Sequence, residues 1–146
     1  MLRIPIKTES AEYEAMIGGG LLARSGEVLR ETLGWVRPTF VVTVAPVRKR
    51  WGKALAKSLQ ISGFAPEFIE MRNGERFKRL STLESLAEEM VRLGADRKAA
   101  VIAFGGGVVG DVAGMLASVY MRGSNWCRSR LRCRRSSMPR LAVKLA

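Results

Sequence analysis

The chain has 146 residues, of which 47% are hydrophobic and 26% charged, the composition of one folded domain with a real core. No apolar run approaches the ~20 residues that a membrane-spanning helix needs. The N-terminal segment MLRIPIKTESAEYE turns polar and acidic too soon for a signal peptide. These features argue against a membrane partner and predict a cytoplasmic location.

The net charge of +12 would suggest a nucleic-acid partner if it were spread over the chain. Residues 124–146, however, hold six Arg, one Lys and no acid, which leaves a surplus of five for the rest. Cys127 and Cys133 lie in the same tail, and the chain has no His to complete a Cys/His zinc site. We therefore expect no nucleic-acid partner and no metal ligands in this chain.

The first 34 residues predict two strands and a helix. Short runs at 2–6 and 13–17 are typical of paired strands joined by a polar turn at 8–10. Gly18–Gly20 is then either the exit of this hairpin, the interpretation that we favour, or a second cofactor-facing loop. The segment LLARSGEVLRETLG follows as a helix that Gly34 ends.

A buried strand and a basic helix follow. Residues 40–44 form a continuous apolar, β-branched run, the pattern of a strand covered on both faces. Pro46 begins a helix whose apolar residues recur every four positions. Its opposite face carries Arg48, Lys49, Arg50, Lys53 and Lys57. No aromatic residue lies among these charges for base stacking, so a solvated face is favoured over a nucleic-acid patch.

Residues 67–71 predict a third strand, and Ser81 with Glu84 forms a capping box before a helix that ends at Gly94. Strands and helices thus alternate along the chain. This alternation predicts a Rossmann-like α/β fold, a parallel sheet with helices on both faces. Ligands of such sheets bind at the carboxyl ends of the strands.

The segment AAVIAFGGGVVGDVAG at 99–114 predicts a strand, a tight glycine turn and a helix. Glycines let an anion approach the backbone, and a helix start presents N–H groups and a positive dipole end. The spacing Gly105-x-Gly107-x-x-Gly110 satisfies the dinucleotide fingerprint, while Asp111 stands where a P-loop carries Lys. Nucleotide binding and a merely tight strand-to-helix turn both remain open at this point.

Three charged residues admit two interpretations each. Glu75 and Lys78 could hold a ribose diol and a phosphate, or form an ordinary surface ion pair. Asp111 could face a ligand, or simply favour the helix dipole by about 0.3–1 kcal/mol.

The segments FGGGVVGDVAG and YMRG closely resemble the signature of the 3-dehydroquinate synthase family, and NGERFK at 73–78 resembles a second motif of that family. The resemblance covers residues 1–123, the first part of a family chain, and implies an NAD-binding α/β domain there. Family members usually carry Asp or Asn near the end of the strand at 40–44, where this chain has Val44 and Ala45.

The resemblance also implies site residues. Arg122 matches an arginine that reaches the substrate phosphate, in some members from a neighbouring subunit; an exposed basic helix end is the alternative. The implied cofactor-binding residues are Asn73, Gly74, Glu75, Lys78, Gly105, Gly106, Gly107, Val108, Val109, Gly110 and Asp111.

Full-length family enzymes convert 3-deoxy-arabino-heptulosonate 7-phosphate to 3-dehydroquinate and phosphate in the shikimate pathway, with NAD and a divalent metal, zinc or cobalt. The resemblance implies a homodimeric parent whose metal ligands, a Glu and two His, lie in a later helical domain that is absent here. We therefore expect an N-terminal fragment of a lyase that is itself inactive. The alternatives are the cofactor domain of an iron- or zinc-dependent alcohol or glycerol dehydrogenase and a basic nucleic-acid-binding module.

The tail, residues 124–146, departs from the family and predicts a non-native or disordered basic segment. One set of codons for residues 126–133, regrouped one nucleotide earlier, spells Val-Gln-Val-Pro-Thr-Thr-Leu, the next family segment. A single-nucleotide loss near the Gly123 codon is the resulting hypothesis, and it leaves Cys127 and Cys133 without a role.

Overall fold

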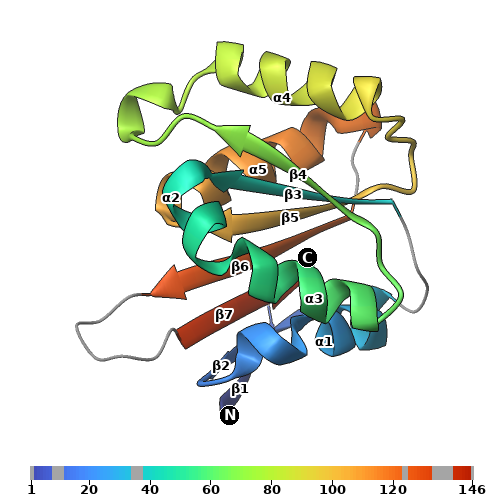
Figure 1. The fold of residues 1–146 in the computed structure, drawn as a ribbon, viewed down its shortest axis with the longest axis vertical. Coiled ribbons are helices and arrows are strands. Elements are labelled where there is room, and N and C mark those ends of the chain that lie inside the picture. Colours follow the sequence, from blue (N-terminus) through green and yellow to red (C-terminus); the bar gives the residue numbers. More distant parts are fainter. Residues whose placement is uncertain (1, 8–11, 34–37, 123–124, 133–139, 146) are drawn as a thin grey trace.

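The computed structural model describes residues 2–7, 12–33, 38–122, 125–132 and 140–145. Its centre is a seven-stranded sheet of order β1-β2-β7-β6-β5-β3-β4. The strands β6, β5, β3 and β4 run parallel, whereas β1, β2 and β7 pair antiparallel. Helices cover both faces (Figure 1). The predicted parallel sheet is thus confirmed for β5, β3 and β4, and β6 adds a fourth parallel strand that the sequence did not predict.

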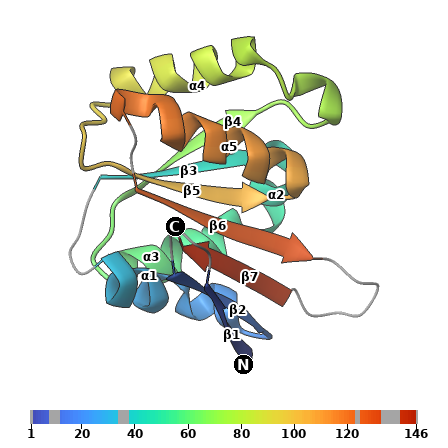
Figure 2. The same cartoon turned by 180° about the vertical axis from the view of Figure 1, so that it is seen from behind.

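Two central strands form the core of the sheet. Every residue of β3 (Thr39–Val44) and of β5 (Ala100–Gly105) is buried, as continuous apolar runs predict for strands covered on both faces. One hydrophobic cluster joins them to α4 (Leu80–Arg92) and α5 (Gly107–Val119), and a second cluster joins them to α1 (Ser25–Leu33) and α3 (Lys53–Ile61). Figure 2 shows α4 and α5 together on one side of the sheet and α1 with α3 on the other.

A close backbone approach holds α1 against α3. A Cβ atom on Gly26 would lie 2.2 Å from the Ser58 carbonyl oxygen, so only glycine fits there. The Gly26 N–H donates to Ser58 Oγ at 3.0 Å, and that hydroxyl donates in turn to the Ala23 carbonyl at 2.8 Å. The short 3-10 helix η1 (Leu21–Arg24) leads into this contact from Gly20, whose φ of 74° closes the turn after the hairpin.

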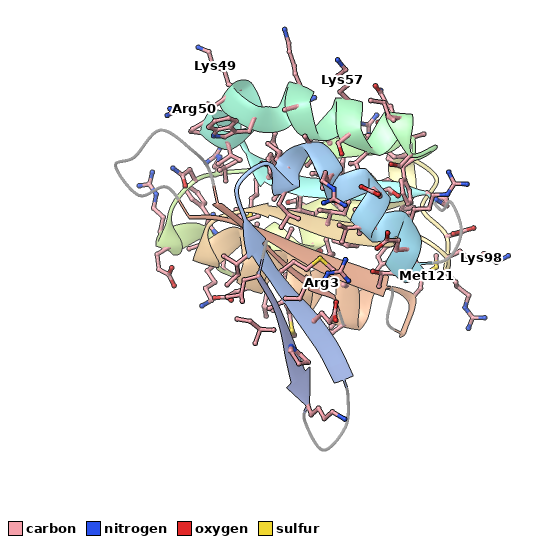
Figure 3. The ribbon with its side chains drawn as sticks, turned by 90° about the horizontal axis from the view of Figure 1, so that it is seen from below. Arg3, Lys49, Arg50, Lys57, Lys98 and Met121 are labelled. Carbon is pink, nitrogen blue, oxygen red and sulfur yellow. The ribbon has the colours of Figure 1, made fainter. Side chains whose placement is uncertain are left out.

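The segment after β3 is less regular than its apolar spacing predicts. Pro46 lies in the first turn of α2 (Ala45–Val47), as expected. A π-helical turn, η2 (Arg48–Gly52), then precedes α3. The basic side chains of this segment are exposed, and Lys49, Arg50 and Lys57 project away from the body of the molecule (Figure 3).

The predicted capping box is wrong. Helix α4 follows β4 (Pro66–Met71) and begins at Leu80, so its N-cap is Arg79 and Ser81 already lies inside the first turn. The Arg79 carbonyl accepts hydrogen bonds from the N–H groups of Thr82 and Leu83. At the other end the prediction is confirmed, because Gly94 adopts a φ of 80° and donates to the Val91 carbonyl.

The two predicted N-terminal strands form the hairpin β1 (Leu2–Lys7) and β2 (Glu12–Gly18), which pair antiparallel as expected. The predicted turn at 8–10 and the helix stop at Gly34 lie outside the described residues. Among the described helices, none combines the length and apolar character that crossing a bilayer requires.

Residues of the tail form two strands, which differs from the expectation of a disordered arm. β6 (Asn125–Arg132) pairs parallel with β5, and β7 (Arg140–Leu145) lies antiparallel between β6 and β2. Ladder hydrogen bonds join backbone groups, so a strand position can be occupied by an unusual sequence.

Candidate functional site

Three parallel strands end at the same edge of the sheet. β3 and β4 end together, with Val44 opposite Met71, and β5 ends beside them, with Phe104 opposite Thr43. The loop of residues 73–78 therefore lies at the same edge as the glycine turn after β5. This is the edge at which open α/β sheets bind their ligands.

The glycine turn presents an accessible helix start. Gly106 is the N-cap of α5, with no side chain capping the helix. Gly106 is exposed, and a Cβ atom built on it would meet nothing within 4 Å. An anion could therefore approach the first amides of α5 without obstruction.

The other residues of the turn differ in exposure. Gly107 and Val108 are half-buried, while Val109 and Gly110 are buried. A Cβ atom on Gly105 would lie 2.7 Å from Val109 Cγ2 and 2.9 Å from Val109 Cβ. The glycine at 105 is thus required by the packing of α5 on its own strand, and the glycine at 106 is the one that leaves open space.

The loop after β4 is a 3-10 turn anchored by one aromatic ring. Gly74 adopts a φ of 125° and accepts a hydrogen bond from the Phe77 N–H, which closes the turn η3 (Glu75–Phe77). The Phe77 ring is buried in the cluster beneath α4. Asn73 and the Glu75 side chain, in contrast, face the solvent.

An ion pair connects this loop to α5. Lys78 Nζ lies 3.0 Å from Asp111 Oδ2 and 3.7 Å from Glu75 Oε1. The hydrogen bond to Asp111, reinforced by the charges of Asp111 and Glu75, raises the pKa of Lys78. The structure thus brings together the three charged residues that the sequence leaves open, next to the start of α5.

Arg122 is not part of this cluster. It lies in the short helix η4 (Tyr120–Arg122), beyond the 13 residues of α5, a length of about 20 Å. Its side chain is outside the described residues.

The residues present do not fit a metal site. Within the described ranges no three His, Cys, Asp or Glu side chains come together as metal ligands, and the whole sequence has no His. The divalent metal that the resemblance implies therefore has no ligand set in this part of the chain.

One feature of the site escaped the sequence analysis. The guanidinium carbons of Arg72, Arg76 and Arg79 lie 5.6, 4.9 and 5.6 Å from the centroid of the Phe77 ring. Beside them, the ends of β3 and β4 enclose a hollow of about 570 Å³. The density of arginines around NGERFK was visible in the sequence, but their convergence on one ring depends on the turn.

Comparison with known proteins identifies the chain. The family described as 3-dehydroquinate synthase N-terminal matches residues 68–130. The 3-dehydroquinate synthase of Koribacter versatilis is 46% identical over 123 residues, which cover 84% of this chain and 34% of that protein. The chain belongs to the 3-dehydroquinate synthase family. It spans about a third of the length of the curated relatives that it matches.

Solved structures of two other synthases resemble this 3-dehydroquinate synthase homologue. A 2-epi-5-epi-valiolone synthase from Streptomyces hygroscopicus, with NAD+ and Zn2+ bound, is 30% identical with a TM-score of 0.64, over 76% of this chain and 30% of that one. A 2-deoxy-scyllo-inosose synthase, complexed with carbaglucose-6-phosphate, NAD+ and Co2+, shares the fold with a TM-score of 0.76 at 23% identity, over 89% of this chain and 35% of that one.

Proposed function

We propose that this chain is the NAD-binding part of a 3-dehydroquinate synthase. The observation that carries the proposal is the exposed Gly106 at an uncapped helix start, beside a loop that is ion-paired to the same helix. The family membership supports NAD as the nucleotide, as does the NAD+ bound in the valiolone synthase relative.

Each candidate residue then takes a stated role. Backbone amides of Gly106, Gly107 and Val108 hold the diphosphate, because the helix start offers donors and positive potential. The side chains of Glu75, Lys78 and Asp111 hold ribose hydroxyls, to which carboxylates can accept hydrogen bonds and an ammonium can donate. Asn73 and Gly74 shape the loop next to them, while Gly105, Val109 and Gly110 fix the turn. NAD, when bound, supplies a hydride acceptor.

The activity of the whole protein is part of the proposal. A full-length relative would convert 3-deoxy-arabino-heptulosonate 7-phosphate to 3-dehydroquinate and phosphate, as a cytoplasmic homodimer, with Arg122 near the substrate phosphate. Since no metal ligand set exists in the described residues, this chain by itself binds the nucleotide and does not turn over.

The domain division is a further part of the proposal. Residues 1–123 are the nucleotide-binding domain, and residues 124–146 carry a sequence displaced by a single-nucleotide loss. The composition changes to arginine, serine and cysteine after residue 123, while the family match runs seven residues further, to residue 130. Resequencing the gene across the Gly123 codon tests this, and an intact frame that continues as basic sequence would refute it.

Calorimetric titration of the 146-residue chain with NAD+ tests the nucleotide site. We expect saturable binding at one site, lost or weakened at least tenfold in Lys78→Ala. Arg97→Gln is the matched control, because this exposed arginine precedes β5 at the opposite edge of the sheet. Heat signals that do not saturate, or equal binding by Lys78→Ala, would contradict the proposal.

A further inference from the structure

Helix α5 is more apolar than a helix with one solvated face. Among its 13 residues only Asp111 and Ser118 have polar side chains. Asp111 is ion-paired to Lys78, and Ser118 Oγ donates back to the Met115 carbonyl at 2.7 Å. A helix that is apolar on all sides is typical of a buried position, covered by its own sheet and by a further layer.

The structure shows no such further layer over α5. Helix α4 lies beside it on the same face of the sheet, and no other described element lies in front of the two helices (Figure 2). Met115 and Val119 of α5 are 48% and 53% exposed. Five of the eight exposed large hydrophobic side chains among the described residues belong to α4, α5 and η4. The exposed apolar surface of the described chain is therefore concentrated on this side.

Helix α4 extends the same surface. Leu80, Leu83, Ala87 and Val91 recur at intervals of three and four residues, the spacing of one helix stripe. Leu83 and Ala87 are half-buried against the cluster beneath them, whereas Leu80 and Val91 are 77% and 61% exposed. The stripe therefore packs on the domain along one side and meets the solvent along the other.

The groove between the two helices is almost neutral. It has a volume of about 380 Å³, and its charged lining residues lie in or just before the N-terminal turns of the helices. There Lys78 and Asp111 offset each other at 3.0 Å, and the Arg79 guanidinium lies over the Phe77 ring. The rest of the lining is aliphatic: Leu80, Leu83, Val112 and Met115. Such a groove has little charge with which to select a charged partner, and it can meet an identical groove without strong repulsion.

We infer that two copies of this chain pack against each other through the α4–α5 face, which consists of Leu80, Leu83, Ala87, Val91, Met115 and Val119. A twofold axis along the groove would place the same apolar stripes opposite each other and would cover α5 on its second side. The α4–α5 face thereby becomes the contact surface of the homodimer proposed above, and this role does not depend on whether NAD+ binds.

The size of the face sets the strength of the dimer. A helix of 13 residues is about 20 Å long and neighbouring helices lie about 10 Å apart, so α4, α5 and η4 present roughly 500 Å² per copy. Two copies would bury about 1,000 Å² in total, the lower limit for a specific interface. We therefore expect a reversible dimer with a dissociation constant on the order of 10–100 μM.

Sedimentation velocity of the full 146-residue chain, from about 1 μM to about 300 μM, measures this association. We expect the average mass to rise from that of a monomer toward that of a dimer. Leu80→Glu and Val119→Lys should each weaken dimerisation at least tenfold, because the interface would have to desolvate an unpaired charge. Ile61→Glu is the matched control: Ile61 is also 77% exposed, but it lies on α3, on the opposite face of the sheet, and its substitution should leave the dimer unchanged.

Urea denaturation shows whether a variant that loses the dimer keeps the fold. Since all three side chains are exposed, the midpoints measured on dilute monomers should match that of the unmodified chain. A chain that stays monomeric to about 300 μM, or a dimer that survives both substitutions, would overturn this inference and leave the nucleotide site unaffected. Cosedimentation of the monomer with vesicles of phosphatidylcholine and phosphatidylglycerol, abolished by Leu80→Glu, would assign the face to a lipid surface and would also overturn it.

Discussion

Gly105 and Gly106 are adjacent in sequence, but alanine substitution should affect them differently: at 105 it should lower the stability of the fold, and at 106 it should lower the affinity for NAD+. At 105 the added methyl group would lie 2.7 Å from Val109 Cγ2 and 2.9 Å from Val109 Cβ, so the first turn of α5 must shift. Overpacking of this kind costs about 1–3 kcal/mol of unfolding free energy.

At 106 the methyl group would meet nothing within 4 Å, and the φ of −80° suits any residue. A gain of about 0.4–1 kcal/mol from the more restricted unfolded chain offsets the poorer helix cap. We therefore expect Gly106→Ala to change the unfolding free energy by less than about 0.5 kcal/mol. The same methyl group fills part of the open space in which the proposal places the diphosphate, so NAD+ affinity should fall at least tenfold.

Urea denaturation and NAD+ titration of both variants separate the two effects, and each variant is the other's control. An unchanged NAD+ affinity in Gly106→Ala would refute the anion cradle at the start of α5. An unfolding free energy in Gly105→Ala that equals that of the unmodified chain would refute the packing argument.

Three further predictions concern stability. Asp111→Asn removes the ion pair with the half-exposed Lys78. Because both side chains are solvated, the midpoint of urea denaturation should barely move, whereas NAD+ affinity measured by titration should fall several-fold; a loss of stability without loss of binding would contradict the assigned role. Ser58→Ala removes the hydrogen bonds to the Gly26 N–H and the Ala23 carbonyl, and should cost about 1–3 kcal/mol in the same denaturation assay; Ser85→Ala, at an exposed helix position, is the control. The hydrogen bond to Asp111 raises the pKa of Lys78. The pKa of Tyr120 is also raised, mainly by burial and to a lesser extent by the charge of Asp96. Both groups bind their protons more tightly in the folded state than in the unfolded state. Their contribution to the free energy of unfolding is therefore fully present below the unfolded pKa values of about 10, and it is lost as the pH rises through the pKa values of the folded state. Denaturation midpoints that stay flat between pH 9 and pH 12 would contradict this.

The central strands and the glycine turn could be predicted because their signals are local. Continuous apolar runs at 40–44 and 100–104 specify strands that are covered on both faces, and the three glycines fix the turn that follows. The capping box failed because tertiary contacts decide where a helix begins. Phe77 anchors the preceding turn so that Arg79, not Ser81, becomes the N-cap of α4.

The site was predictable in composition but not in geometry. The sequence gives no spacing by which Lys78 should meet Asp111 rather than its near neighbour Glu75; that contact depends on how α5 packs beside the loop. Likewise, the glycine motif does not distinguish Gly105 from Gly106. Only the position of Val109 in the structure shows that Gly105 is needed for packing, whereas Gly106 leaves the backbone accessible.

The buried ring of Phe77 couples the nucleotide loop to the interior of the domain. Leu86 and Met90 of α4 belong to the same buried cluster as Phe77. A substitution that leaves a cavity at Leu86 or Met90 should therefore loosen the packing of the Phe77 ring and, with it, the loop of residues 73–78. By thermodynamic linkage the coupling runs in both directions, and an occupied loop should slow the opening of α4. Hydrogen exchange at the amides of that helix would then report ligand occupancy from the far side of the ring.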